Sequence, residues 1–224
     1  MSNQTQILLE AFRKPLPGKK AQSLMAPSVR FTGKVLPEPN KARESSVLIL
    51  LYVKEGNWYL PLMKRSVYKG AHSGQVSFPG GKTEDGDTCY FNTAIREAEE
   101  EIGIVGKDVS YVGELTSLYI PNSNFVVYPQ VGVLPYAPEF KPDPREVDVL
   151  IEAPLSQLAN PQNIKCFSRK INDIVVEAPF FSLNDFEIWG ATAMILSEFL
   201  QVLKENQLNP LLHSYSDYNA QGYQ

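Results

Sequence analysis

The sequence predicts an α/β (α+β) fold in which a mixed β-sheet lies between helices. Three observations predict it. Apolar, β-branched runs typical of strands dominate the middle of the chain, two segments with helical character occur at 88–102 and 188–205, and 43% of the 224 residues are hydrophobic. A chain of this length and composition can bury a core without disulfides or a structural metal. Strands combined with inserted and terminal helices favour a sheet covered on both faces.

The first 45 residues precede the predicted sheet. Apolar residues at helical spacing predict a short helix over 5–14, which Pro15 and Pro17 end. The remainder, up to residue 45, is rich in Pro, Lys and Ser and is expected to be mostly extended. We therefore expect a lead-in at 1–45, a main domain at 46–208 and a loosely ordered tail at 209–224.

A hairpin and a long loop are expected next. The continuous apolar run at 47–53 predicts a buried strand, and the turn residues at 54–57 connect it to a return strand at 58–64. The loop at 65–87 contains five glycines, and a loop of this length in a compact domain is usually functional.

The helix at 88–102 and several strands follow. Asp87 is a suitable N-cap for this helix, and Gly103 a suitable residue to end it. Further elements are predicted as strands at 109–117, 125–134 and 147–151, a Pro-rich bend at 135–144, a hairpin of 166–171 and 174–181 around Asn172-Asp173, and the final helix at 188–205.

Charge and cysteine content exclude several classes of protein. The chain has 21 basic and 25 acidic residues and a pI near 5.3, which argues against a general nucleic-acid-binding protein. It has no Cys-x-x-Cys pair for a thiolate zinc site, so Cys89 and Cys166 are expected to be free thiols. The first residues are not expected to form a signal peptide, and the apolar runs are expected to be too short to span a bilayer, so we expect a cytoplasmic protein without membrane partners.

Three glutamates on the predicted helix at 88–102 are the first candidates for chemistry. Glu97, Glu100 and Glu101 are spaced i, i+3 and i+4, so they fall within an arc of about 100°. Like charges at this spacing repel, and the helix dipole disfavours anions near a C-terminus. These two unfavourable features indicate a functional site, with a solvated acidic face as the alternative. The apolar residues of the helix form a separate arc: Phe91, Ile95, Ala98 and Ile102.

Carboxylates without a neighbouring His or Cys are typical ligands of Mg²⁺ or Mn²⁺. Such ions neutralise the charge of a bound diphosphate and activate water. The Gly80-Gly81 pair in the preceding loop allows the backbone to approach a phosphate or a metal closely. A simple turn is the alternative interpretation of these two glycines.

Together these residues resemble the Nudix hydrolases. The family box is G-x5-E-x7-R-E-U-x-E-E-x-G-U, where U is a bulky apolar residue, and residues 96–104 match its second half with Ala98 at the first apolar position. The first half departs from the box. Gly81 lies one residue too far from Arg96, and Asp87 or Thr88 replaces the box glutamate that usually supports the arginine.

The run before the box is similar to the coenzyme A pyrophosphatase branch of the family. That branch has an Arg-Ser pair, a histidine and G-Q-V-x-F-P-G-G at fixed spacing. This chain matches it with Arg65-Ser66, His72, Gly74-Gln75-Val76 and Phe78-Pro79-Gly80-Gly81. Weaker similarities to the branch extend over nearly the whole chain.

The resemblance implies the Nudix fold and the hydrolysis of a nucleoside diphosphate linked to another group. It implies that Glu97, Glu100 and Glu101, together with the Gly80 carbonyl, ligate Mg²⁺ or Mn²⁺, while Arg96 holds the loop and the glutamates in place. The substrate-binding candidates are Arg65, His72, Gln75, Gly81 and Lys82. Arg65 would bind phosphate, and His72 would bind phosphate or pantetheine, or else order the loop.

The resemblance also implies an acidic residue that orients the attacking water, here called the distal acid. One of the box glutamates, Glu146 or Glu139 could have this role. The alternative for Glu146 and Glu139 is that they are exposed charged residues of a loop. Trp189 is expected in the core rather than as a stacking platform. For coenzyme A the products would be 3′,5′-ADP and 4′-phosphopantetheine.

The alternatives are another substrate, such as ADP-ribose, a dinucleotide, a nucleotide sugar or capped RNA, and a non-catalytic ligand-sensing Nudix domain. The three intact acids disfavour the last. Because family members commonly form dimers, a homodimer is the assembly that the resemblance implies.

Overall fold

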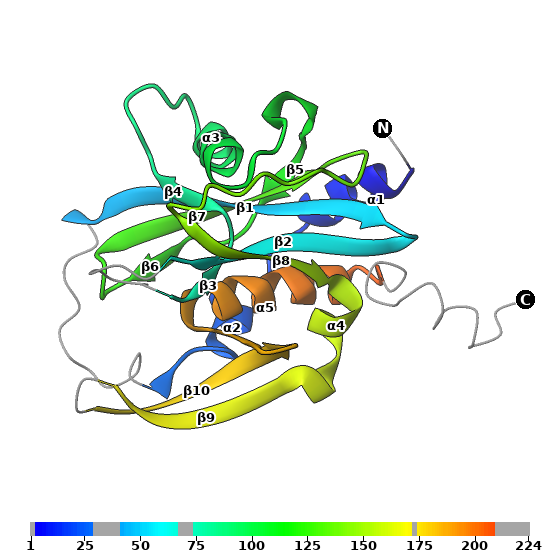
Figure 1. Cartoon of the computed structure of the whole chain (residues 1–224). Coiled ribbons are helices and arrows are strands. Elements are labelled where there is room, and N and C mark those ends of the chain that lie inside the picture. The colour runs from blue at the N-terminus through cyan, green and yellow to red at the C-terminus, as the bar shows by residue number, and fades with distance from the viewer. Residues whose placement is uncertain (1–2, 29–40, 67–73, 172–173, 209–224) are drawn as a thin grey trace, which may run out of the picture.

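The computed structural model describes residues 3–28, 41–66, 74–171 and 174–208. Within these ranges a large and a small β-sheet lie one above the other, with helices between and around them (Figure 1). The large sheet has the order β3 (Val76–Ser77), β2 (Asn57–Arg65), β1 (Arg43–Lys54), β7 (Phe125–Val133) and β5 (Ser110–Glu114). Attached to this path are β4 (Gly80–Lys82) on β1, β6 (Leu118–Ile120) on β7, and β8 (Val147–Pro154) on β2. Because β1 and β7 are parallel and the other pairs antiparallel, the sheet is mixed, as predicted.

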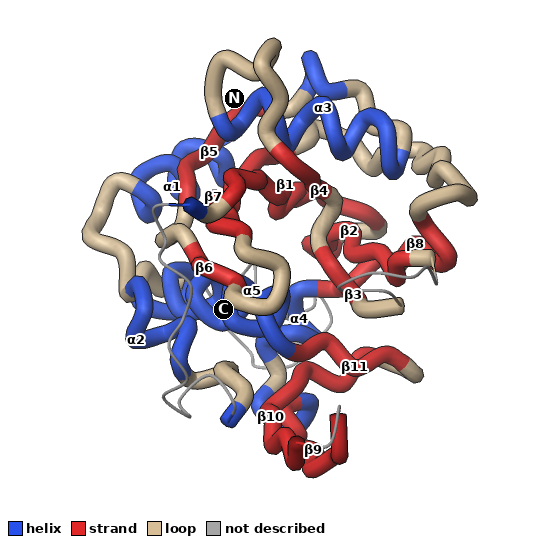
Figure 2. The backbone as a smooth tube through the Cα atoms, turned by 90° about the vertical axis from the view of Figure 1, so that its left-hand side faces the viewer, coloured by secondary structure: helices blue, strands red, loops and turns tan. Residues whose placement is uncertain are grey.

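Helices cover both faces of the large sheet. Helix α3 (Tyr90–Ile102) lies on one face. On the other face lie α1 (Asn3–Phe12), α2 (Gly18–Ser23) and α5 (Gly190–Glu205). Figure 2 shows α5 between the large sheet and the small sheet, which consists of β9 (Ile164–Ile171), β10 (Ile174–Leu183) and β11 (Phe186–Trp189). The short helix α4 (Leu155–Ala159) leads from one sheet toward the other.

Strand β1 is buried on both faces, which explains its continuous apolar sequence. Leu48, Leu50 and Tyr52 pack on the side of α3. Ile49 and Leu51 pack on the side of α5. The middle of the strand therefore lies between two apolar layers.

The N-terminal segment differs from the prediction at one place. Helix α1 confirms the predicted first helix, but residues 18–23 form α2, so the prediction of an extended chain is wrong there. The helix is held by tertiary contacts. The buried carboxylate of Glu198 accepts hydrogen bonds from the Gly18 N–H at 3.2 Å and from Gln22 Nε2 at 2.8 Å.

Most of the other predicted helices and strands are present with shifted ends. The β1–β2 hairpin is confirmed, and its turn uses left-handed backbone at Glu55 and Gly56. The predicted loop at 65–87 contains the short strands β3 and β4, and the final helix begins at Gly190 rather than at residue 188. Strands β9 and β10 pair as a hairpin, while its tip at 172–173 and the tail at 209–224 lie outside the described residues.

Both cysteines are exposed and carry free thiols, as expected. Among the helices of the described residues, none has the length and apolar character needed to cross a membrane.

Candidate active site

Arg96 connects α3 to the loop that precedes it. Its guanidinium pairs with both oxygens of Asp87, with Nε–Oδ1 and Nη2–Oδ2 distances of 3.2 and 3.1 Å, and donates to the Lys82 carbonyl at 3.1 Å. The hydrogen bonds from Arg96 lower the pKa of Asp87 to about 2. Asp87 is thus the arginine's acidic partner, and its predicted N-cap role is wrong, because α3 begins at Tyr90 after Cys89 without a side-chain cap.

The end of α3 follows the prediction. Gly103 adopts the left-handed conformation, with φ of 70°, and its N–H donates to the Glu99 carbonyl. A side chain at this position would also collide with Lys141. Both the backbone conformation and the lack of space therefore favour glycine here.

Glu101 is the buried member of the acidic stripe, with 2% of its side chain exposed. The Gly80 N–H donates to its Oε2 at 2.8 Å, and Arg65 Nη1 lies 3.3 Å from its Oε1. Burial raises the pKa of Glu101 to about 8, since the opposing effects of the Gly80 N–H and Arg65 are smaller and the charges of Glu97 and Glu146 raise it further.

Glu97 is partly buried beside β4. Its Oε1 accepts a hydrogen bond from Arg96 Nη1 at 2.9 Å, and burial raises its pKa. A Cβ on Gly81 would collide with the Glu97 carboxylate. The second glycine of the Gly80-Gly81 pair is therefore what lets this carboxylate lie against the strand.

Glu100 is the exposed member of the stripe. Its side chain is 61% exposed, and its Oε1 lies 3.5 Å from Arg96 Nη1. The structure thus places all three predicted glutamates around Arg96, Arg65 and β4. Within the described ranges, however, no three Asp, Glu, His or Cys side chains converge closely enough to hold a metal ion.

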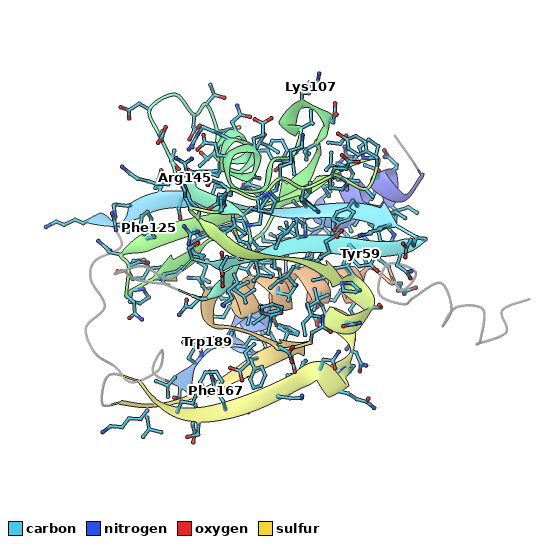
Figure 3. The ribbon with its side chains drawn as sticks, in the orientation of Figure 1. Tyr59, Lys107, Phe125, Arg145, Phe167 and Trp189 are labelled. Carbon is cyan, nitrogen blue, oxygen red and sulfur yellow. The ribbon has the colours of Figure 1, made fainter. Side chains whose placement is uncertain are left out.

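A segment beyond the box is hydrogen-bonded to the end of α3. The Lys141 and Asp143 N–H groups donate to the carbonyls of Ile102 and Glu101, each at 2.9 Å. This segment leads to Glu146, whose N–H donates to the Asp143 carbonyl at 3.1 Å, and the neighbouring Arg145 is labelled in Figure 3. Glu146, one of the candidates for the distal acid, is therefore held near the helix that carries the acidic stripe.

Glu146, unlike Glu139, belongs to the site. Its Oε2 lies 3.9 Å from Arg65 Nη2, and its carbonyl accepts a hydrogen bond from the Ser66 N–H at 2.9 Å. The Glu146 charge also raises the pKa values of Glu97 and Glu101. Glu139 is exposed and makes no such contact within the part of the chain that the structure describes.

A pocket of about 550 Å³ adjoins the buried end of the stripe. Its cationic lining residues are Arg43, Arg65 and Lys82, and no acidic residue lines it among those the structure describes. Gln75, Gly80 and Gly81 line it as well, so five of the predicted substrate-side or metal-side residues meet here. His72 lies outside the described residues.

Two features of the pocket bear on the sequence predictions. Trp189 does not line it and packs edge-on against Phe167 in the small sheet, at 5.4 Å between ring centres (Figure 3). Arg43 was not predicted as a site residue. It reaches the pocket because β1 and β7 pair in parallel and place it beside Phe125, a register that the sequence alone does not reveal.

The NUDIX domain model matches residues 42–192, which is most of the chain and contains the acidic stripe and the cationic residues of the pocket. The chain belongs to the Nudix family. The fold agrees, since a MutT/nudix family protein from Enterococcus faecalis superposes with a TM-score of 0.52 over 95% of this chain and 78% of its own, at 16% sequence identity.

Several Nudix proteins are similar in sequence. Nudix hydrolase 15, mitochondrial, of Arabidopsis thaliana is 35% identical over 178 residues, which cover 75% of this chain but only 61% of that protein. The mitochondrial coenzyme A diphosphatase NUDT8 of Homo sapiens is 32% identical over 188 residues, which cover 81% of this chain and 79% of that protein. The uncharacterized Nudix hydrolase NudL of Photorhabdus laumondii is 31% identical over 176 residues, which cover 77% of this chain and 93% of that protein.

These relationships identify the chain as a Nudix pyrophosphatase that acts on a small-molecule substrate. Two of the relatives are named as mitochondrial, so the cytoplasmic location stays a prediction.

Nudix hydrolases generally use divalent ions such as Mg²⁺ or Mn²⁺, and the donor chemistry of this site suits them. Glu97, Glu100 and Glu101 offer hard oxygen donors on one helix, and Glu101 lies next to the backbone of Gly80. Burial beside other carboxylates penalises the charged form of Glu101, and a divalent cation would offset that penalty.

Proposed function

We propose that this Nudix hydrolase cleaves the phosphoanhydride of coenzyme A or an acyl-coenzyme A, giving 3′,5′-ADP and 4′-phosphopantetheine or its acyl derivative. The observation that carries the proposal is the position of the branch-specific run. Its residues Arg65, Gln75, Gly80 and Gly81 line the pocket, and Arg65 and Gly80 also contact Glu101. The similarity to a human protein named as a coenzyme A diphosphatase supports the same substrate.

Glu97, Glu100 and Glu101, with the Gly80 carbonyl, are the residues that would hold Mg²⁺ or Mn²⁺. Such an ion, when bound, neutralises charge on the diphosphate oxygens and makes water more acidic. Arg96 and Asp87 act on these residues indirectly, because their ion pair fixes the loop after β4 against α3.

Arg65 and Glu146 carry the remaining roles. Arg65 lines the pocket with its guanidinium already beside Glu101, so it can donate a fork of hydrogen bonds to a diphosphate oxygen. Glu146, on the far side of Arg65, would accept the proton of the attacking water. The water oxygen bonds to one phosphorus, the bond from that phosphorus to the bridging oxygen breaks, and two phosphate monoesters leave.

Product analysis tests the proposal. The protein is incubated with coenzyme A and Mg²⁺, and the mixture is separated by chromatography beside ADP-ribose, a dinucleotide and a nucleotide sugar treated in parallel. We expect 3′,5′-ADP and 4′-phosphopantetheine, at a higher kcat/KM than for any other member of the panel. Equal or faster cleavage of ADP-ribose would assign the enzyme to a different substrate.

A further inference from the structure

One face of β1 forms the outer end of the pocket. Arg43, Ser45 and Val47 alternate along this face, and all three line the pocket. Strand β4 pairs with β1 so that Lys82 lies opposite Ser45. Phe125 of β7 lies beside Arg43 in the parallel register. Two cationic side chains from neighbouring strands therefore share one face at one end of the cavity.

Neither cation has an acidic partner among the residues that the structure describes. The Arg43 guanidinium lies over the Phe125 ring, 4.1 Å from its centre, and donates to the Ser123 carbonyl at 3.0 Å. The Lys82 ammonium has no hydrogen bond or ion pair with any residue that the structure describes. Glu44, the acidic neighbour of Arg43, belongs to the opposite face of β1, where it accepts a hydrogen bond from the Tyr128 hydroxyl.

The arrangement around Arg43 favours an anion. Stacking on Phe125 restricts the guanidinium, so less freedom is lost when its fork binds a ligand. The Ser123 hydroxyl, which is shielded from solvent and has no partner among the described residues, belongs to the same wall of the pocket. A doubly charged phosphate monoester matches two unpaired cations better than a single carboxylate does.

Arg43 lies apart from the part of the pocket that adjoins the acidic stripe. Gly80, which donates to Glu101, pairs with Val47, four residues along β1 from Arg43. Four residues of strand correspond to about 13 Å. If the diphosphate of the substrate binds near Gly80, Arg43 is therefore positioned to bind a different group of the same substrate.

We propose that Arg43 and Lys82 form a subsite for a second phosphate of the substrate, the 3′-phosphate of a 3′-phosphoadenosine nucleotide. This inference rests on the proposed function, because coenzyme A carries that phosphate in addition to its diphosphate. The subsite would give the enzyme a preference for coenzyme A over dephospho-coenzyme A.

Direct binding tests the subsite without any turnover. Calorimetric titration of the full chain with 3′,5′-ADP and with 5′-AMP should show at least tenfold tighter binding of 3′,5′-ADP. Arg43→Gln and Lys82→Gln should each reduce this ratio, and the double variant should bring it close to one. Equal binding of the two nucleotides by the wild type, or a ratio that survives in the double variant, would overturn the proposal.

Arg169→Gln is the matched control, because it removes another arginine that lies over a phenylalanine. Arg169 stacks on Phe167 at 4.5 Å in the small sheet and does not line the pocket. The 3′,5′-ADP preference should be unchanged in this variant. A loss equal to that of Arg43→Gln would show that net charge, rather than a subsite, causes the preference.

Kinetics separate this proposal from the proposed function. The ratio of kcat/KM for coenzyme A to that for dephospho-coenzyme A should fall toward one in Arg43→Gln and Lys82→Gln. If the wild type cleaves both substrates equally, the subsite assignment fails while the phosphoanhydride chemistry stands. If neither substrate is cleaved but 3′,5′-ADP is still preferred in binding, the proposed function fails and the subsite stands.

Discussion

Three glutamates on two turns of one helix have three different environments. Glu101 is almost fully buried, Glu97 is partly buried against Gly81, and Glu100 is largely exposed. Identical side chains therefore differ in the cost of carrying a charge, and burial is the main cause of the difference. Substitutions at the exposed position separate catalysis from folding most cleanly.

Replacing Glu100 by Gln should lower kcat by orders of magnitude and leave the free energy of unfolding nearly unchanged, since the side chain is 61% exposed. The measurements are turnover of coenzyme A with Mg²⁺ and urea denaturation. Glu99→Gln is the control, because Glu99 accepts a hydrogen bond from the Gly106 N–H and points away from the stripe. Turnover near that of the wild type in Glu100→Gln would reject the metal assignment.

Replacing Asp87 by Asn should lower the free energy of unfolding by about 1–3 kcal/mol at neutral pH, because Arg96 loses the most buried of its charged partners. In the folded protein the pKa of Asp87 is about 2, below its ordinary value of 3.8. The extra stability of the wild type is thus present above about pH 4 and lost as the pH falls toward 2.

Urea denaturation of the wild type and Asp87→Asn across this pH range measures the effect. Asp85→Asn, an exposed change in the same loop, should have little effect at any pH. A wild-type advantage that stays constant down to pH 2 would contradict the role of the Arg96–Asp87 pair.

At the scale of elements, close contact between β4 and α3 brings the glycine pair to the acids. Gly80 has a φ of 149°, and a Cβ at this position would collide with the Ser46 carbonyl, while the absence of a side chain at Gly81 leaves room for the Glu97 carboxylate. The two adjacent glycines thus allow two different close contacts, that of Gly80 with β1 and that of Gly81 with α3.

Gly81→Ala should reduce kcat at least tenfold, because the added methyl group displaces the Glu97 carboxylate. Gly86→Ala is its matched control, since a Cβ there meets nothing within 4 Å. Both variants are compared in steady-state kinetics with coenzyme A and in thermal unfolding. Equal activities of the two variants would show that the position of Glu97 does not depend on Gly81.

Long elements with strong apolar patterns were predictable from the sequence, and short ones were not. Strand β1 and helices α3 and α5 follow from their periodicity or from continuous apolar runs. Helix α2 and strands β3, β4, β6 and β11 have at most six residues, which is too short for a clear periodic pattern, and β4 pairs with a strand that is distant in sequence. The acidic stripe was predicted from spacing along one helix, whereas the pairing of Arg96 with Asp87 and the place of Arg43 depend on tertiary structure.

At the scale of the whole molecule, the pocket lies where the large sheet meets α5. Ala191, Thr192 and Ile195 of this helix line it, and the Thr192 hydroxyl donates to the Val76 carbonyl at 2.9 Å. Further along the same helix, the fully buried Glu198 accepts hydrogen bonds from α2 and from the Thr116 N–H. One carboxylate thus joins the N-terminal segment, the sheet and the helix of the pocket.

Glu198→Ala should lower the free energy of unfolding by about 2–4 kcal/mol, because it leaves several buried donors without an acceptor. Glu205→Ala, near the exposed end of the same helix, should have an effect below about 0.5 kcal/mol. Chemical denaturation monitored by tryptophan fluorescence measures both. An equally small effect in the two variants would contradict the joining role of Glu198.

The hydrogen bonds from Lys141 and Asp143 to the end of α3 have an evolutionary consequence. They make the acidic stripe and Glu146 one unit, while the outer wall of the pocket comes from β1, β6 and β7. Mutations in that wall can alter which molecule is accepted without changing the spacing of the acids. Descendants of such a chain could therefore acquire new substrates while inheriting the reaction intact.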